Sequence, residues 1–188
     1  MTNLCTATGF LTGALLLAAC SGGGPGVAGP ALNTDAGEFG DAGATSATPT
    51  PDEFGCYGTG SRWTRGNRES PFMHPGGDCI DCHEAMREGP RYASAGSVNN
   101  YWDERLDCAG TAGITVELTG ADGTVVTATT NGAGNFWFRS TVMTPYTARL
   151  IGPDGSVRQM FTPQTDLDCM HCHTEMGVNG APGRIVAP

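Results

Sequence analysis

Short runs of apolar and β-branched residues, separated by turn residues, occupy the chain from residue 114 to residue 161. The turns between them contain ADG, NGAG, MTP and GPDGS, which favour a reversal of the chain. Short strands at this regular spacing predict a small antiparallel β-sandwich over residues 111–162. The five expected strands are 114–119, 125–130, 135–140, 146–151 and 157–161.

The N-terminal pattern is different, because an apolar run over residues 10–19 ends in the sequence LLLAAC at Cys20. This run is shorter than the roughly 20 residues that a membrane-spanning helix needs. The sequence resembles the lipobox of bacterial lipoproteins, which implies a signal peptide at residues 1–19 and a lipid on Cys20. We therefore expect an exported, lipid-anchored chain at the outer membrane, on its periplasmic or cell-surface side. The alternative is an ordinary signal peptide in which Cys20 is incidental.

The following segment and the overall charge narrow the class of protein. Residues 21–54 are mostly Gly, Ala, Pro, Ser and Thr, which predicts a flexible tether over residues 20–55. The rest of the chain is long enough for one domain. Ten basic residues against 19 acidic ones give a net charge of −9. This charge argues against nucleic acid or an anionic membrane surface as a partner and favours basic docking partners.

Four of the eight cysteines form two Cys-x-x-Cys-His motifs, CIDCH at 79–83 and CMHCH at 169–173. This spacing is typical of covalent haem attachment, in which both sulfurs bind one porphyrin and the following His binds its iron. The chain thus resembles the multihaem c-type cytochromes of bacterial electron-transfer chains. The resemblance implies two haem c groups, with proximal ligands His83 and His173. They would be attached through Cys79, Cys82, Cys169 and Cys172.

The four motif cysteines have two alternative functions besides haem attachment. All four could hold one structural zinc ion, although that arrangement needs no His after both pairs. Each pair could instead be a thioredoxin-like redox dithiol, which is typical of a βαβ setting.

The two motifs share the longer pattern D-C-x-x-C-H-x-x-M, with Asp78 and Met86 in the first and Asp168 and Met176 in the second. The pattern indicates a duplicated haem-binding unit or two sites under the same packing demand. A Met three residues after the proximal His lies on the same helical turn and haem face. We therefore expect both methionines to pack on a porphyrin rather than bind iron.

Candidate distal ligands come from the remaining histidines. His171 lies between two attachment cysteines, so it cannot reach the opposite face of its own haem. It is either an exposed or hydrogen-bonded side chain or the distal ligand of the haem held by His83. In the second case His74 would serve the other haem, with Met73 as an alternative ligand.

Cys56 and Cys108 are left over after the leader, the lipid site and the haem motifs are assigned. In an oxidising compartment an even pair of remaining cysteines predicts a disulfide. It would close a loop of about 50 residues around the first motif.

Chain order completes the prediction of a mainly β fold. A sandwich at 111–162 is inserted between a first haem-binding unit at 56–110 and a second at 163–188, each containing loops and a short helix. The pieces GITVELTGADG and TNGAGNFWF resemble the carboxypeptidase regulatory-like family of transthyretin-type sandwiches. That resemblance implies a fold and no activity. The insertion would place the two haems either side by side at one end of the sandwich or apart at its two ends.

The function expected from these features is electron transfer between redox protein partners by a membrane-tethered dihaem cytochrome. The sequence contains no recognisable catalytic constellation, so we predict a carrier rather than an enzyme. The alternatives are a dihaem peroxidase or other haem enzyme, and a structural module whose sandwich binds a partner. Homo-oligomerisation is compatible with all three.

Overall fold

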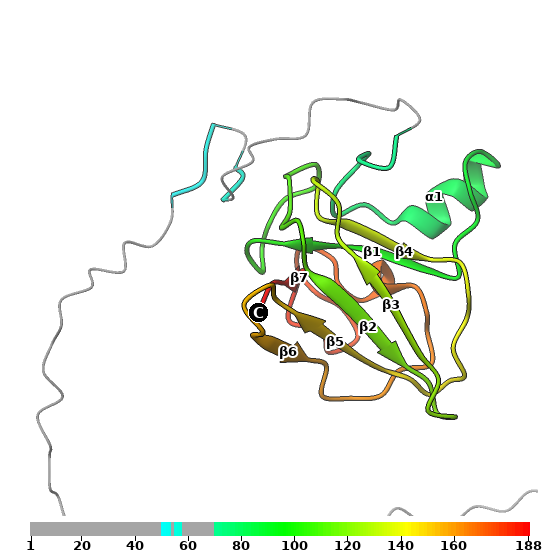
Figure 1. The fold of residues 1–188 in the computed structure, drawn as a ribbon. Helices are drawn as coiled ribbons and strands as arrows, with labels where there is room; N and C mark the ends of the chain where they lie inside the picture. Colours follow the sequence, from blue (N-terminus) through cyan, green and yellow to red (C-terminus); the bar gives the residue numbers. More distant parts are fainter. Residues whose placement is uncertain (1–49, 54, 58–69) are drawn as a thin grey trace, which may run out of the picture. The chain divides into compact units, whose positions relative to one another are not determined.

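The protein is represented by a computed structural model that describes residues 50–53, 55–57 and 70–188. The predicted signal peptide, Cys20 and most of the predicted tether lie outside the described residues. The described residues belong to one compact unit. Its helices are α1 (Cys79–Met86) and the 3-10 helix η1 (Cys169–His171). The strands, drawn in Figure 1, are β1 (Ser94–Asn99), β2 (Thr115–Thr119), β3 (Val125–Thr129), β4 (Asn135–Phe138), β5 (Thr147–Ile151), β6 (Val157–Gln159) and β7 (Ile185–Val186).

Two sheets form the body of this unit, which confirms the predicted mainly β fold. One sheet has the strand order β3-β2-β5-β6, and all its neighbours are antiparallel. The other has the order β4-β1-β7. In this second sheet β1 is antiparallel to β4 and parallel to the two-residue strand β7. All five predicted strands are present, and each ends within two residues of the prediction.

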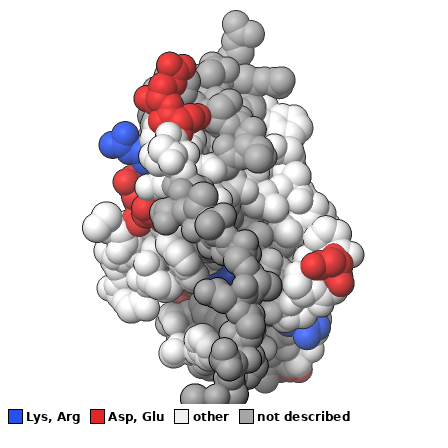
Figure 2. Space-filling view, turned by 90° about the vertical axis from the view of Figure 1, so that its left-hand side faces the viewer, with Lys and Arg blue, Asp and Glu red and all other residues white. Residues whose placement is uncertain are grey.

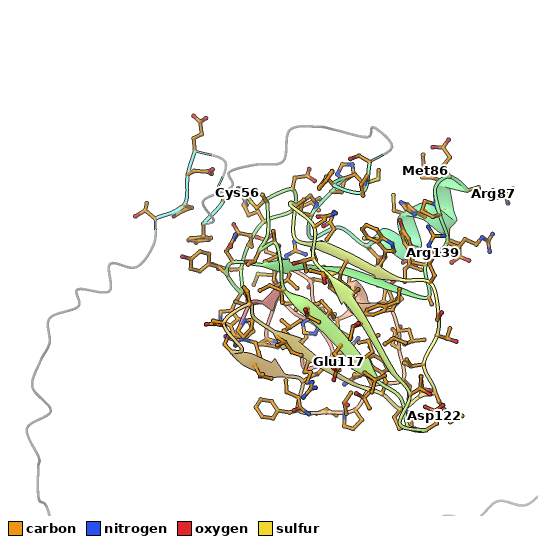
Figure 3. The ribbon with its side chains drawn as sticks, in the orientation of Figure 1. Cys56, Met86, Arg87, Glu117, Asp122 and Arg139 are labelled. Carbon is orange, nitrogen blue, oxygen red and sulfur yellow. A yellow bond between two sulfur atoms is a disulfide. The ribbon has the colours of Figure 1, made fainter. Side chains whose placement is uncertain are left out.

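Alternation along the strands explains why the sheets face each other. Val116 and Leu118 of β2 are buried, while the residues between them point outward. Leu150 pairs with Val116 in the neighbouring strand, so it lies on the same inner face. On the outer face of this sheet, Arg149 donates to Glu117 over 2.6 Å, from the strand position where Figure 3 labels Glu117. The buried core consists of Val98, Ile114, Val116, Leu118, Phe136, Phe138, Val142, Tyr146 and Leu150.

Strand β1 is the main feature that sequence analysis missed. Its sequence SAGSVN has little of the β-branched character that marked the other strands, yet all six residues are buried. β1 comes from the predicted first haem-binding unit, and β7 comes from the predicted second unit. Both units therefore contribute strands to the sandwich, and the boundaries at 110/111 and 162/163 do not separate structural layers.

Buried polar side chains fasten the loop that precedes α1 to this sheet. Ser97 Oγ accepts a hydrogen bond from the Gly76 amide at 2.9 Å and donates to Asn135 Oδ1 at 2.7 Å. Asn135 also donates to the Met73 carbonyl at 2.8 Å. These bonds satisfy polar groups in the interior, and they fix the point from which α1 begins.

The predicted disulfide between Cys56 and Cys108 is confirmed, with an S–S distance of 2.04 Å. Both cysteines are buried, and their sequence separation is 52 residues. The covalent loop contains the first motif and β1 but none of the second motif.

Candidate functional site

Helix α1 carries the first Cys-x-x-Cys-His motif. It begins after Asp78, whose side chain accepts a hydrogen bond from the Asp81 amide at 2.9 Å and so caps the helix. Cys79, Cys82 and His83 are spaced i, i+3 and i+4, which places them on one face of the helix. No residue of α1 is buried, and Figure 3 shows Met86 and the following Arg87 at its outer end. The helix thus has a face that carries two thiols and an imidazole, on which Cys79 and His83 are partly buried and Cys82 is exposed.

The His83 ring is held by a backbone carbonyl and by aromatic neighbours. Its Nδ1 lies 2.9 Å from the Pro90 carbonyl oxygen, so Nδ1 carries the proton and donates it. The Tyr92 ring centroid is 5.5 Å from the His83 ring and 5.8 Å from the Trp137 ring. Nε2 is therefore the nitrogen left for a metal. An open depression beside the ring is lined by His83, Glu84, Arg87, Gly89 and Arg91.

The second motif begins in η1 and is embedded more deeply. Asp168 accepts a hydrogen bond from the Met170 amide at 3.0 Å, so it is an N-cap like Asp78, although it bonds the amide two residues on rather than three. The His173 amide donates to the Cys169 carbonyl at 3.1 Å, so the motif again completes one helical turn. Met170 is buried and Cys169 packs against the hydrophobic core.

His173 is oriented in the same way as His83. Its Nδ1 donates to the Gly183 carbonyl at 2.9 Å, in the segment that leads into β7. Burial lowers the pKa of His173, which favours the neutral imidazole that binds metals. Both predicted proximal histidines therefore use Nδ1 for a backbone carbonyl and keep Nε2 for another partner.

The two motifs lie next to each other. Both α1 and η1 contact strand β1, and the second motif joins its edge, with Asp168 bridging Ala95. Ser94 Oγ is 3.5 Å from Cys169 Sγ. His171 Nε2 is 3.4 Å from Asp81 Oδ2, which connects the second motif directly to the first. Of the two arrangements open to the sequence, the side-by-side placement of the motifs is the one observed.

The electrostatics of the thiols are unlike those of a redox dithiol. Burial, together with the Asp168 and Asp78 carboxylates, raises the pKa of Cys79 to about 12. Burial raises the pKa of Cys169 to about 11. A thioredoxin-like thiol needs a lowered pKa, because the thiolate is the reactive form. These environments therefore argue against the dithiol alternative.

The zinc alternative requires the four motif sulfurs to converge. Among the residues that the structure describes, no cluster of three or more potential metal ligands includes a motif cysteine. A tetrahedral thiolate site holds its sulfurs about 4 Å apart at Zn–S bonds of about 2.3 Å. The observed positions argue against one zinc ion shared by both motifs.

His171 points out of the second motif, as expected, and forms hydrogen bonds there. Its Nδ1 lies 2.9 Å from Asp166 Oδ2, and its Nε2 faces Asp81. The hydrogen bonds to Asp166 and Asp81 raise the pKa of His171 to about 9. This is the hydrogen-bonded alternative for His171. Its role as a distal haem ligand stays a prediction, and Nε2 would have to leave Asp81 to fulfil it.

His74 and Met73, the other candidate distal ligands, lie in the loop before α1. His74 Nδ1 is 2.8 Å from Asp107 Oδ1, and the residue has a left-handed backbone with φ of 41°. The hydrogen bond from Asn135 to Met73 also holds this loop. Their roles as iron ligands stay predictions. The methionines expected to pack on porphyrin, Met86 and Met176, are 62% and 82% exposed.

Sequence analysis did not assign a role to the aspartates that surround His171. Asp78, Asp81 and Asp168 converge on it from both motifs, with one ligand atom of each residue within 4.8 Å of the others. Burial and the neighbouring Asp78 carboxylate raise the pKa of Asp168 to about 6. The Asp that precedes the first Cys of both motifs was the available signal. Its function as a helix cap explains why both motifs share it.

Comparison with known proteins gives no further assignment, because the chain matches no family model, no curated protein and no solved structure. Within the described ranges, none of the helices combines the length and apolar character required to cross a membrane.

Proposed function

We propose that this chain is a lipid-anchored dihaem c-type cytochrome that carries electrons between redox protein partners in the periplasm or at the cell surface. The observation that carries the proposal is the matched orientation of His83 and His173. In each motif a backbone carbonyl accepts a hydrogen bond from Nδ1, which leaves Nε2 as the unprotonated nitrogen that can bind iron. A proximal haem ligand requires this tautomer and a fixed ring.

The environment of α1 supports a bound apolar group at the first motif. A helix without a single buried residue gains little stability from packing. Thioether bonds to Cys79 and Cys82 would attach a haem to this helix, with Nε2 of His83 as iron ligand. Tyr92 lies beside His83 and Trp137 lies beside Tyr92, and this aromatic surface would pack against the edge of that haem. At the second motif, Cys169, Cys172 and His173 would hold the other haem.

The chemistry follows from these two positions. A bound haem supplies a reversible one-electron change at iron, and the chain supplies the ligands and burial that set its potential. Because the two motifs share contacts with β1, the chain would hold the two groups as neighbours and allow electrons to pass between them. The lipid on Cys20 would keep the domain at the membrane surface.

The surface charge supports protein partners of opposite charge. The chain has 19 acidic and ten basic residues, and Figure 2 shows acidic side chains in separate groups on one face, with few basic ones. A negative surface of this kind raises the encounter rate with basic redox proteins, and the effect decreases with salt.

The test combines mass spectrometry and absorbance on protein released from membranes. We expect a denatured chain that keeps two covalent haems and a lipid, and low-spin spectra in both oxidation states. Cys79→Ser/Cys82→Ser and Cys169→Ser/Cys172→Ser should each lose one haem mass, while Cys20→Ala should lose only the lipid. A mass without haem would overturn the proposal. A high-spin haem with peroxide turnover would instead indicate the enzyme alternative.

A further inference from the structure

We propose that Asp78, Asp81, Asp168 and His171 bind one divalent transition-metal ion at the junction of the two motifs. One oxygen from each aspartate and one nitrogen of His171 lie within 4.8 Å of one another. Ligand atoms around a single ion with bonds of about 2.0–2.2 Å lie at most about 4.4 Å apart, so small side-chain rotations would bring these four atoms around one ion. The site is formed by side chains other than the cysteines and proximal histidines, so it does not depend on the proposed haems.

The site follows from the similarity of the two motifs. Asp78 and Asp168 each precede the first Cys, and Asp81 and His171 each precede the second Cys. Oδ1 of both capping aspartates is used by a backbone amide, at 2.9 Å in the first motif and 3.0 Å in the second. Their Oδ2 atoms remain for the junction. The two motifs therefore meet through equivalent sequence positions, and each motif contributes two of the four metal ligands.

The buried oxygen of Asp168 is an independent indication of a ligand. Asp168 is 7% exposed, and its Oδ2 has no hydrogen-bond partner. Within the described part of the chain, no Arg forms an ion pair with Asp78, Asp81 or Asp168, and the chain has no Lys. His171 is the positive group that faces this cluster, and its single charge stands against three carboxylates, one of them buried. A buried carboxylate whose charge is only partly compensated is unfavourable. A cation at this position would supply the missing positive charge.

A further aspartate orients the imidazole for this role. Asp166 Oδ2 lies 2.9 Å from Nδ1 of His171, which turns Nε2 toward the cluster. Nε2 lies 3.4 Å from Asp81 Oδ2 and 3.9 Å from Asp78 Oδ2. The other oxygen of Asp166 accepts the Asp168 amide at 2.9 Å, so the orienting side chain is itself fixed. A carboxylate behind a histidine ligand is a recurrent arrangement in metal sites.

The ligand types indicate which ion the site would take. Three carboxylates and one imidazole suit Mn²⁺ or Zn²⁺, whereas Ca²⁺ takes six to eight oxygen ligands. The ion would connect α1 to η1 and fix the separation of the two motifs. Its function would be to hold the junction of the two motifs together.

The experiment is a Mn²⁺ titration of chelator-treated full-length protein, with free Mn²⁺ measured by room-temperature magnetic resonance. We expect the unaltered protein to bind one Mn²⁺ per chain. Asp81→Asn and Asp168→Asn should each weaken binding about tenfold or more, and Asp166→Asn should weaken it by about tenfold through the imidazole. Glu88→Gln removes an equal charge from an exposed position next to α1 and should leave binding unchanged.

The variants also distinguish the loss of a metal ligand from unfolding of the protein. Asp81 has an exposed side chain, so Asp81→Asn should keep the circular dichroism spectrum of the unaltered protein. Mn²⁺ and Zn²⁺ should raise the thermal midpoint of the unaltered protein and of Glu88→Gln, but not that of Asp81→Asn. Equal affinity in all variants, or no binding by the unaltered protein at millimolar Mn²⁺, would overturn the proposal. Mn²⁺ binds thiolates poorly, so missing haems would not imitate either result.

Discussion

The first and second Cys-x-x-Cys-His motifs have the same spacing and the same Asp cap, but they differ in how the protein supports them. The first lies on α1, which buries none of its residues. In the second motif, Met170 is buried and Cys169 packs against the core. The orientation of its His173 ring is fixed by the hydrogen bond to the Gly183 carbonyl. The motif therefore sets the relative positions of two sulfurs and an imidazole, whereas the surrounding chain sets their exposure.

This difference predicts separate roles for the two sites. In the proposed carrier, the less buried first motif would be the one that contacts a partner, whereas the second is integrated with the sandwich that carries both. Changes near α1 should therefore alter local structure, and matched changes near η1 should alter the free energy of unfolding of the whole domain.

The largest effect is expected from removing the disulfide. Cys56→Ser/Cys108→Ser opens a covalent loop of 52 residues. Loss of this constraint on the unfolded chain should lower the free energy of unfolding by about 4 kcal/mol. Chemical denaturation measures this loss. Because the loop contains only the first motif, hydrogen exchange should show greater loss of protection in α1 than around η1. Equal loss of hydrogen-exchange protection in α1 and around η1 would contradict the idea that the protein supports the two motifs differently.

A matched pair inside the motifs tests the difference most directly. Met170 and Ile80 both follow the first Cys, but Met170 is 3% exposed and Ile80 is only partly buried. Met170→Ala should lower the free energy of unfolding by about 2–4 kcal/mol, since it leaves a cavity. Ile80→Ala should cost less than about 1 kcal/mol, because its environment is partly solvent. Urea denaturation of both variants provides the comparison, which similar losses would refute.

The glycines after the motifs provide a smaller test. Gly177 and Gly89 both have a left-handed backbone, with φ of 64° and 76°. A Cβ on Gly177 would meet the Ala181 carbonyl, whereas one on Gly89 would lie 3.0 Å from Cε1 of the His83 ring. We expect Gly177→Ala to cost about 3 kcal/mol and Gly89→Ala about 1 kcal/mol. Thermal unfolding should rank them in this order, and the reverse order would show that the His83 ring cannot move.

The smallest effect is expected from the aromatic contacts of the first motif. Tyr92 lies between His83 and Trp137, with ring centroids 5.5 and 5.8 Å away. A double-mutant cycle of Tyr92→Leu and Trp137→Leu should give a coupling energy of about 1 kcal/mol. Ring orientation at His173 should be unaffected, as judged by its imidazole resonances. A coupling energy near zero would mean that the contact between the Tyr92 and Trp137 rings does not stabilise the protein.

Sequence analysis anticipated the features that depend on local pattern. The five strands between 114 and 161 were identified because turn residues separate β-branched runs, and the disulfide followed from counting the cysteines. Strand β1 was missed because its burial results from neighbours on both faces rather than from its own sequence. Strand β7 was missed because its two residues are too few to show an alternation of apolar and polar positions.

The sequence predicted only those parts of the candidate site that lie close together along the chain. The motif residues are contiguous, so their spacing was readable directly. The contact between Asp81 and His171 joins positions 90 residues apart, and it depends on both motifs meeting at β1. The Asp before the first Cys was visible as a repeat in the sequence. Whether Asp78 and Asp168 act as N-caps depends on where each helix begins, which the sequence pattern did not define.

The pairing of β1 with β7 also affects the order in which this domain can assemble. Val98 pairs with Ile185, and the intervening chain includes all the other strands and the second motif. The Gly183 carbonyl reaches His173 only when this late segment has docked, and Arg184 is then enclosed with its guanidinium on the Glu104 and Gly76 carbonyls. If a haem is attached to the second motif as proposed, the attachment would meet less steric hindrance before that closure. Docking of this C-terminal segment would then separate an open form of the second motif from a mature form in which the His173 ring is locked.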